Sequence, residues 1–208
     1  MLENCKCCLT WIYNYKPRAM EKPHLDLNSI VYRIALHNDE QAYRLLFDQL
    51  YNRLKCFAAS ILKSKELGEE IACDTLFSLW SNRGKLTAIS NIKVYAYVIA
   101  KNKALNELKK ISGSRVSLSD DIDVDISFHN LTPEQVLINE ELKKTIEQVV
   151  NNLPPRCKLV FQLVKEDNLS YKEVAEILDI SVKTVDAQLV TAVKRIAAVV
   201  KKEYNLIR

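Results

Sequence analysis

The chain has 208 residues, of which 48% are hydrophobic and 27% charged, and a formal net charge of +4 at pH 7. This length suits one large domain or two small ones. With only 3 glycines and 5 prolines, and many residues that favour helices, the expected fold class is all-α. No stretch approaches the ~20 apolar residues that span a bilayer, and the N-terminus lacks the pattern of a secretory signal. A cytoplasmic protein without membrane insertion is therefore expected.

Basic side chains gather in two segments that are separated by an acidic one. Residues 83–110 contain seven Lys or Arg against one acid, and residues 183–208 contain six against two. Residues 112–139 contain five acids and one Arg. This layout favours a chain that contacts phosphates at two places, although solvated helix faces would give the same counts.

The N-terminal half is helix-like throughout, from about residue 28 to 111. Apolar residues recur three and four apart over residues 39–64 and predict a helix. A second helix is predicted over residues 66–83, with Ile71, Thr75, Phe77, Leu79 and Trp80 as its apolar surface. A third is predicted over residues 92–110, because no breaker interrupts it rather than from a clean stripe. Residues 1–27 are expected to be a disordered extension, and residues 28–112 a small helical domain.

A linker is predicted over residues 113–138, where Gly, Ser and Asp replace the apolar pattern. Thr132, Pro133 and Glu134 resemble a helix start, with proline at the first helical position. The helix that follows is amphipathic and is stopped by Pro154 and Pro155. Residues 139–208 then form a second small helical domain, so the linker is expected to be a flexible acidic connection.

The strongest local signal lies in residues 169–200 and predicts a helix-turn-helix. Ser170 and Glu173 fit a capping box that opens a short helix, and residues 179–181 make the turn. A narrow apolar stripe then marks a second helix, formed by Val185, Leu189, Ala192, Ile196 and Val199. Two antiparallel core helices would share this pattern. The small Ala175 and the polar, lysine-containing outer face favour DNA binding.

The six cysteines are interpreted as free thiols. Cys5, Cys7 and Cys8 form a cluster, but no second ligand pair follows it closely, so neither a metal site nor any cofactor is expected. The three histidines stand apart in the sequence, at His24, His37 and His129. No catalytic constellation is found, and the chain is not expected to be an enzyme.

Three segments resemble the extracytoplasmic-function (ECF) sigma factors of the sigma-70 family. Residues 152–196 resemble the C-terminal domain that reads the promoter −35 element. Residues 66–83 resemble the polymerase-binding helix, and residues 91–110 resemble the segment that melts and reads the −10 element. The resemblance covers residues 28–202, with residues 28–112 as sigma region 2 and residues 139–208 as region 4. It implies a factor that directs core RNA polymerase to promoter DNA and promotes melting, with an anti-sigma factor as a further partner.

The resemblance also implies three sets of contact residues. The polymerase-binding set is Glu69, Glu70, Asp74, Phe77 and Trp80, whose two aromatic residues would serve equally well in a core. The −10 set is Lys85, Ser90, Asn91, Lys93, Tyr95, Lys101, Asn102, Asn106, Lys109 and Lys110. The −35 set is Ser181, Lys183, Thr184, Asp186, Ala187, Gln188, Val190, Thr191 and Lys194. Gln188 is the strongest candidate for reading a base, since its amide can pair with adenine at two atoms.

Several alternatives stay open at this level. Tyr95 would either stack on a base or pack in the domain. The linker acids Asp120, Asp121, Asp123 and Asp125 would either imitate nucleic acid or belong to an ordinary tether. A stand-alone helix-turn-helix repressor or activator is the main alternative function, and a thiol or metal sensor that uses the N-terminal cysteines is a third. Met20 is a second possible start of translation.

Overall fold

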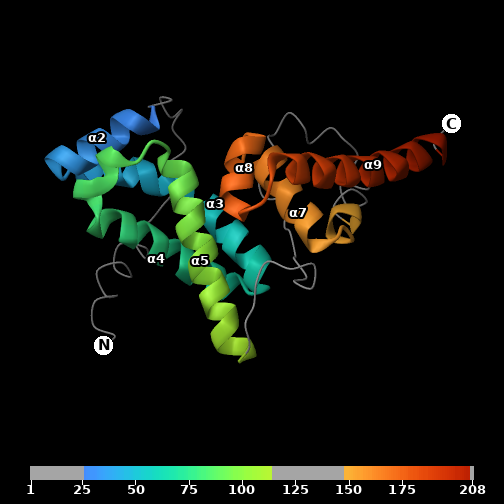
Figure 1. The fold of residues 1–208 in the computed structure, drawn as a ribbon, viewed down its shortest axis with the longest axis horizontal. Coiled ribbons are helices and arrows are strands. Elements are labelled where there is room, and N and C mark those ends of the chain that lie inside the picture. The colour runs from blue at the N-terminus through green and yellow to red at the C-terminus, as the bar shows by residue number, and fades with distance from the viewer. Residues whose placement is uncertain (1–25, 114–147, 207–208) are drawn as a thin grey trace.

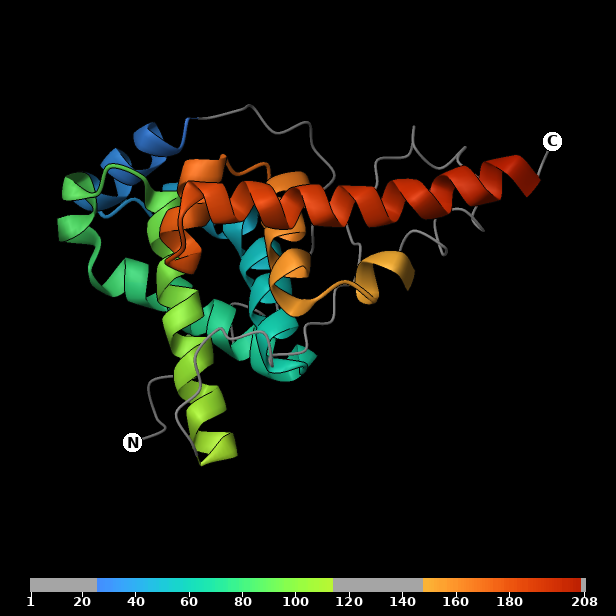
Figure 2. The same cartoon turned by 45° about the vertical axis from the view of Figure 1, so that its right-hand side comes forward.

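The computed structural model describes residues 26–113 and 148–206, and these residues form helices and turns without a strand. The all-α prediction is confirmed. The first helical group comprises α2 (Leu27–His37), α3 (Glu40–Leu62), α4 (Lys65–Ser81), a 3-10 segment η2 (Arg83–Ala88) and α5 (Ile92–Ser112). The second helical group comprises α7 (Pro155–Phe161), a π-helical turn η4 (Gln162–Glu166), α8 (Tyr171–Leu178) and α9 (Val182–Leu206). Figures 1 and 2 show α8 beside α5. The C-terminal end of α9 projects away from α5 in both views.

Some predicted features lie outside the described residues. These are the N-terminal extension with its three cysteines, the acidic linker with Asp120, Asp121, Asp123 and Asp125, and most of the helix expected after Pro133. The last turn of that helix is seen at residues 148–151, and α7 then begins with proline in its first turn. Within the described ranges, no helix is long and apolar enough to cross a membrane.

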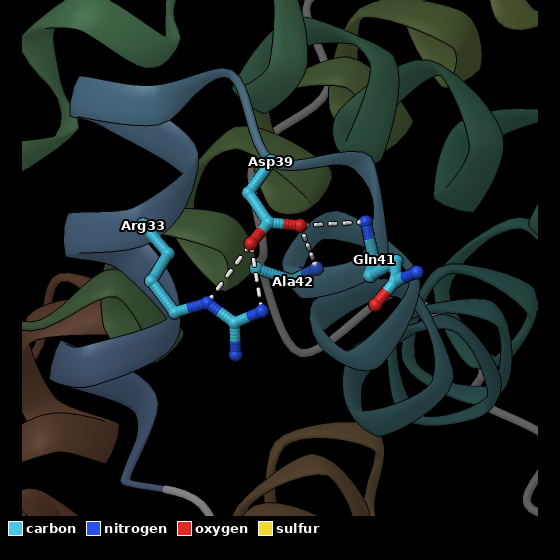
Figure 3. A network of polar contacts seen from close by, with 4 residues as sticks. All are labelled: Arg33, Asp39, Gln41 and Ala42. Carbon is cyan, nitrogen blue, oxygen red and sulfur yellow. Dashed lines mark hydrogen bonds and ion pairs between the residues drawn. The ribbon is translucent and has the colours of Figure 1, made fainter.

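A polar turn separates α2 from α3, at the point where the helix predicted over residues 39–64 begins. Asn38 adopts a left-handed conformation with φ 51°, and Asp39 caps α3 by accepting hydrogen bonds from the backbone N–H groups of Gln41 (2.9 Å) and Ala42 (3.0 Å). Arg33 of α2 donates to the other carboxylate oxygen from Nε (2.9 Å) and Nη2 (2.7 Å), as Figure 3 shows. The backbone N–H of Ala42 and the Arg33 guanidinium lower the pKa of Asp39. These bonds fix the corner between α2 and α3.

Helices α3 and α4 cross closely at Gly68. A Cβ atom at this position would lie 2.7 Å from the Ala59 Cβ and 2.9 Å from the Ala59 Cα and backbone N. The two helices therefore approach at a point where one has no side chain and the other only a methyl group. This crossing places α4 against the long α3.

Gly68→Ala is expected to lower the free energy of unfolding by ~1–3 kcal/mol, because the added methyl group must push apart backbone atoms in a packed interior. Helix propensity alone would raise the free energy of unfolding by about 1 kcal/mol. The sign of the measured change therefore distinguishes steric overlap from helix propensity. Urea unfolding followed by circular dichroism measures the change. Gly84→Ala is the matched control, since Gly84 is exposed and has no atom within 4 Å of the added methyl group. Equal destabilisation of both variants would contradict the packing argument.

The mixed pattern of α5 has a physical reason in its contacts. The helix packs against α3 and α4 within its own group and also against α8 of the second group. Tyr97 is fully buried and meets Phe57 of α3 edge to face, with ring centroids 5.1 Å apart. A helix that is covered from several directions needs apolar residues around most of its circumference. This explains why the sequence showed no narrow stripe.

The helix-turn-helix is built as the sequence predicts. Ser170 and Glu173 form a capping box. The C-cap Asp179 takes the left-handed conformation, with φ 57° and ψ 52°, which aspartate tolerates better than most residues. The predicted stripe is buried at Val185, Leu189 and Ala192, and partly buried at Ile196. The side chain of Val199 is outside the described residues.

Candidate nucleic-acid and protein interfaces

One exposed face of α4 combines two acids with an aromatic ring. Glu70, Asp74 and Phe77 are spaced four and three residues apart, so they lie on the same side of the helix, and all three are exposed. Asp74 forms an ion pair with Lys103 of α5 at 3.5 Å, yet its side chain keeps 56% exposure. Glu69 is half-buried and pairs with Lys55 of α3 at 3.3 Å. The face suits a partner surface that is basic around an apolar centre.

The two aromatic residues of the predicted polymerase-binding set differ in their surroundings. Phe77 is 45% exposed. Trp80 is half-buried between Tyr43, whose ring centroid lies 4.8 Å away, and Arg83, whose guanidinium carbon lies 4.7 Å from the Trp80 ring centroid. The guanidinium also donates to the Trp80 carbonyl at 3.0 Å. Trp80 therefore packs the corner between α4 and η2, and Phe77 is the aromatic ring that a partner can reach.

The predicted −10 set is divided between two faces of α5 and the segment before it. Lys85 and Ser90 are exposed in this segment, which contains the 3-10 helix η2. Tyr95, Asn102, Asn106 and Lys109 are exposed along one side of α5, and Tyr95 is 38% exposed. Lys110, also exposed, pairs with Glu107 at 2.7 Å. Lys93 and Lys101, eight residues apart, lie on the other side, since Lys93 and Tyr95 are separated by about 200° around the helix.

This other side of α5 is covered by the second helical group. Asn91 caps α5 through its side-chain oxygen and donates from Nδ2 to Glu173 Oε1 at 2.7 Å. Lys93 Nζ donates to the backbone carbonyl of Asp167 at 2.6 Å. Lys101 is only 9% exposed. Burial lowers the pKa of Lys101, and the negative charge of Asp179 acts in the opposite direction. Three predicted DNA contacts are thus turned towards protein.

The centre of this contact is Asp167, which the sequence analysis did not single out. Its backbone carbonyl also accepts a hydrogen bond from Arg53 Nη1 at 2.8 Å, across 114 positions of sequence. Its carboxylate lies 3.9 Å from the same guanidinium. Oδ2 of Asp167 and the hydroxyl of Tyr97 are both buried without a well-aligned hydrogen bond. No periodicity marks such a residue, because its burial depends on a helix from the other half of the chain.

The acids at this contact have shifted pKa values. Burial raises the pKa of Asp167 to about 6, against the lowering effects of the Tyr97 hydroxyl, Arg53 and Lys93. Burial, with the charge of Asp167, raises the pKa of Glu166 to about 7. Burial also works to raise the pKa of Glu173, but hydrogen bonds from Ser170 and Asn91 outweigh it and hold this pKa below its ordinary value. The ionised carboxylate of Asp167 therefore lowers the stability of the folded protein near neutral pH.

Asp167→Asn is expected to stabilise the protein at about pH 8 by ~1–3 kcal/mol, and by ~1 kcal/mol less at about pH 5. The folded-state pKa of Asp167, about 6, lies above its ordinary value of 3.8. The folded protein thus binds this proton more tightly than the unfolded chain, and stability falls as pH rises through this range. Arg53 and Lys93 bond to the backbone carbonyl, so asparagine leaves those bonds intact. Urea unfolding at both pH values measures the difference.

The matched control is Glu176→Gln, which removes an exposed acid from α8. Its effect on the free energy of unfolding should be close to zero and equal at the two pH values. A destabilising effect of Asp167→Asn at about pH 8 would contradict the assignment of Asp167 as a buried, costly carboxylate.

The first turns of α9 present an open polar surface. Ser181 caps the helix by accepting from the Thr184 backbone N–H at 3.0 Å. Most of the predicted −35 set is exposed, namely Ser181, Lys183, Asp186, Ala187, Val190, Thr191 and Lys194, while Thr184 and Gln188 are half-buried. Gln188 Oε1 accepts a hydrogen bond from the Cys157 thiol at 2.6 Å. Its amide nitrogen is the atom left to meet a base, and Thr191 donates to the Ala187 carbonyl at 2.9 Å.

Metal ligands do not gather in the described residues, which hold no cluster of three or more His, Cys, Asp or Glu that could bind an ion. Cys56, Cys73 and Cys157 take part in no disulfide within the same residues.

Comparison with known proteins identifies the two helical groups. Residues 46–113 match the family described as sigma-70 region 2, and residues 143–196 match sigma-70 region 4. The ECF RNA polymerase sigma-E factor of Escherichia coli (strain K12) is 24% identical over 164 residues, which cover 74% of this chain and 84% of that protein. The protein of the same name in Haemophilus influenzae is 23% identical over 161 residues, covering 74% of this chain and 85% of that protein.

Two solved structures have a similar fold. The sigma factor RpoE of Bartonella quintana, in complex with the anti-sigma factor NepR, gives a TM-score of 0.55 at 17% identity and covers 80% of this chain and 98% of its own. CnrH in complex with the cytosolic domain of CnrY gives 0.53 at 18% identity, covering 85% of this chain and 99% of its own. The chain belongs to the sigma-70 family and is an extracytoplasmic-function RNA polymerase sigma factor, a non-enzymatic subunit that binds polymerase and promoter DNA.

Proposed function

We propose that each helical group performs one of the two DNA-binding steps of initiation. In this proposal residues 28–112 form the domain that binds core polymerase and the −10 element, and residues 139–208 form the domain that binds the −35 element. Residues 113–138 connect them. The observation that carries the assignment is the exposure of the first turn of α9, where Ser181, Val182 and Lys183 are all exposed. Helix N-termini and lysines are suited to bind phosphates.

Base recognition at −35 is assigned to the middle of the same exposed surface. Asp186, Gln188 and Thr191 lie about one to two helical turns after Lys183, which is proposed to bind phosphate. An amide side chain can read adenine, and a carboxylate can accept from cytosine N4. Gln188 would present its amide nitrogen, because its oxygen is bonded to Cys157.

Melting at −10 is assigned to the segment before α5 and to the open side of that helix. Lys85 and Ser90 are exposed there, and the 38% exposure of Tyr95 leaves part of its ring available to stack on a base. Trapping an unstacked base needs polar edges and positive charge along the strand. Holding the single strand pulls the duplex open without covalent chemistry.

Attachment to core polymerase is assigned to α4, through Glu70, Asp74 and the exposed ring of Phe77. Regulation by an anti-sigma factor is proposed as well, since both solved relatives described above are in complexes: RpoE with the anti-sigma factor NepR, and CnrH with the cytosolic domain of CnrY. The site of action proposed for this chain is the cytoplasm, where bacterial polymerase and DNA are found.

The test is gel filtration with core polymerase stripped of sigma, followed by run-off transcription from templates with randomised −35 and −10 elements. Co-elution with core and recovery of a defined pair of elements are expected. Lys183→Ala should weaken transcription from the recovered promoters, whereas Lys172→Ala, on the exposed side of α8, should not. A chain that ignores core polymerase but shifts duplex DNA alone would overturn the assignment in favour of a stand-alone regulator.

A further inference from the structure

A side chain from outside α9 holds the residue of α9 that is proposed to read a base. Gln188 is half-buried, and its Oε1 accepts a hydrogen bond from the Cys157 thiol at 2.6 Å. Cys157 belongs to α7 and is only 3% exposed. Figures 1 and 2 show α7 beside α9, and these two helices are in contact. One atom of the Gln188 amide is therefore tied to the interior of the second helical group.

This bond determines which atom of the Gln188 amide faces inward. The amide oxygen can only accept hydrogen bonds and the amide nitrogen can only donate them, whereas a thiol is a weak donor through hydrogen and a weak acceptor through sulfur. Turning the amide over would give Nε2 the sulfur as its acceptor and would leave Oε1 without the thiol proton. The observed arrangement, with Oε1 towards α7, leaves Nε2 for contacts outside the protein.

The amide atom that remains decides which base edge fits. In the major groove, guanine presents two neighbouring acceptors, N7 and O6, whereas adenine presents the acceptor N7 beside the donor N6. The bidentate pairing of a glutamine with adenine needs Oε1 as well as Nε2. With Oε1 held by Cys157, Gln188 presents the two N–H groups of Nε2, which match the two acceptors of guanine. Against adenine, one of these N–H groups would face another donor.

We infer that Cys157 is a positioning residue for promoter recognition, which holds the Gln188 amide nitrogen towards DNA and thereby directs Gln188 to guanine rather than adenine in the −35 element. This inference rests on the −35 role proposed for Gln188. It replaces the adenine pairing expected from the sequence, because that expectation treated both atoms of the amide as available. Cys157 acts through Gln188, since its own side chain is buried.

The size of the effect follows from the strength of one hydrogen bond. The net contribution of a neutral hydrogen bond corresponds to a factor of roughly two to ten in an equilibrium constant. Cys157→Ala removes the donor and allows the amide to turn over, so recognition of adenine relative to guanine should rise by about this factor. Cys157→Ser keeps a donor on the same Cβ atom, and this variant should retain the preference for guanine.

The test uses holoenzyme assembled from core polymerase and the full chain, with templates that are randomised only in the −35 element. Each template carries a barcode in its transcribed part, so sequencing the transcripts gives the activity of every −35 sequence. Gln188→Ala identifies the base pair that Gln188 reads, as the pair at which this variant loses the preference of the unmodified chain. The measured quantity is the ratio of A·T to G·C templates among the transcripts at that pair.

Val160→Ala is the matched control for loss of packing in α7. Val160 is fully buried in the same helix, and its side chain has no hydrogen-bonding atom. A less stable α7 should reduce total transcription in both Val160→Ala and Cys157→Ala, but only Cys157→Ala should raise the ratio of A·T to G·C templates. An equal rise in the two variants would overturn the inference, because packing would then explain it.

The expected result is a preference for G·C at the Gln188 pair that Cys157→Ala shifts towards A·T and Cys157→Ser retains. A preference of the unmodified chain for A·T at that pair would overturn the inference. An unchanged ratio in Cys157→Ala would overturn it too, as would equal shifts in Cys157→Ala and Cys157→Ser, since the donor would then be irrelevant. The proposed function fails differently: if Gln188→Ala changes the preference at no base pair, Gln188 does not read the −35 element, and the inference fails with that assignment.

Discussion

Replacing Phe57 by alanine is expected to lower the free energy of unfolding by ~3–5 kcal/mol, the range for removal of a buried aromatic side chain. Phe57 has no exposed surface and meets Tyr97 edge to face at 5.1 Å. Its ring therefore packs against α5, the helix that carries the proposed −10 surface. The loss combines the transfer of an apolar ring to water with the cavity left beside Tyr97. Urea unfolding followed by circular dichroism measures it.

The control for this prediction is a second phenylalanine of the same helical group. Phe77→Ala should change the free energy of unfolding by less than about 0.5 kcal/mol, as for most surface substitutions, because Phe77 is 45% exposed. Equal losses in the two variants would show that Phe77 is part of the core and would contradict its assignment as a contact.

Phe77→Ala is expected to weaken binding to core polymerase about 30-fold, which corresponds to ~2 kcal/mol for an aromatic anchor at the centre of an interface. The reason is the position of Phe77 beside Glu70 and Asp74 on one exposed side of α4. Affinity is measured by titrating labelled chain with core polymerase. Trp80→Ala would not give as clean a result, since Trp80 also packs on Tyr43 and Arg83.

The matched control for binding is Tyr32→Ala. Tyr32 is an aromatic residue of α2 with 56% exposure, outside the predicted polymerase-binding set. Its replacement should leave the affinity for core polymerase unchanged. A similar loss in both variants would argue that any exposed ring contributes, and the specific role of α4 would be wrong.

Local features of this chain could be predicted because local chemistry causes them. The capping box of Ser170 and Glu173 needs only residues three apart. The turn predicted over residues 179–181 depends on Asp179, which tolerates the left-handed conformation that the structure shows there. The stripe of α9 is a property of helical spacing. These features, with the all-α class and the helix-turn-helix, are seen in the structure. The family followed from the same motifs, and the matches to sigma-70 regions 2 and 4 confirm it.

Exposure could not be predicted in the same way, because it depends on which elements meet. Phe77 and Trp80 are three residues apart and chemically alike, yet one faces solvent and the other packs in a corner. The sequence predicted Lys93 and Lys101 as DNA contacts together with Tyr95. In the structure both lysines lie on the side of α5 that the second helical group covers. The bonds between Arg33 and Asp39 could not be predicted for a related reason, because apolar spacing does not register polar contacts.

The contact around Asp167 marks the clearest limit of reasoning from sequence. Its partner Arg53 lies 114 positions away, and nothing in the pattern of either segment connects them. The identity of each helix, its caps and its apolar side are set by residues within one or two turns, so the order of residues is enough to fix them. The pairing of the helical groups is set by burial and by hydrogen bonds between distant segments. It therefore exists only once the chain has folded, and it decides which of the predicted contact residues are free to act.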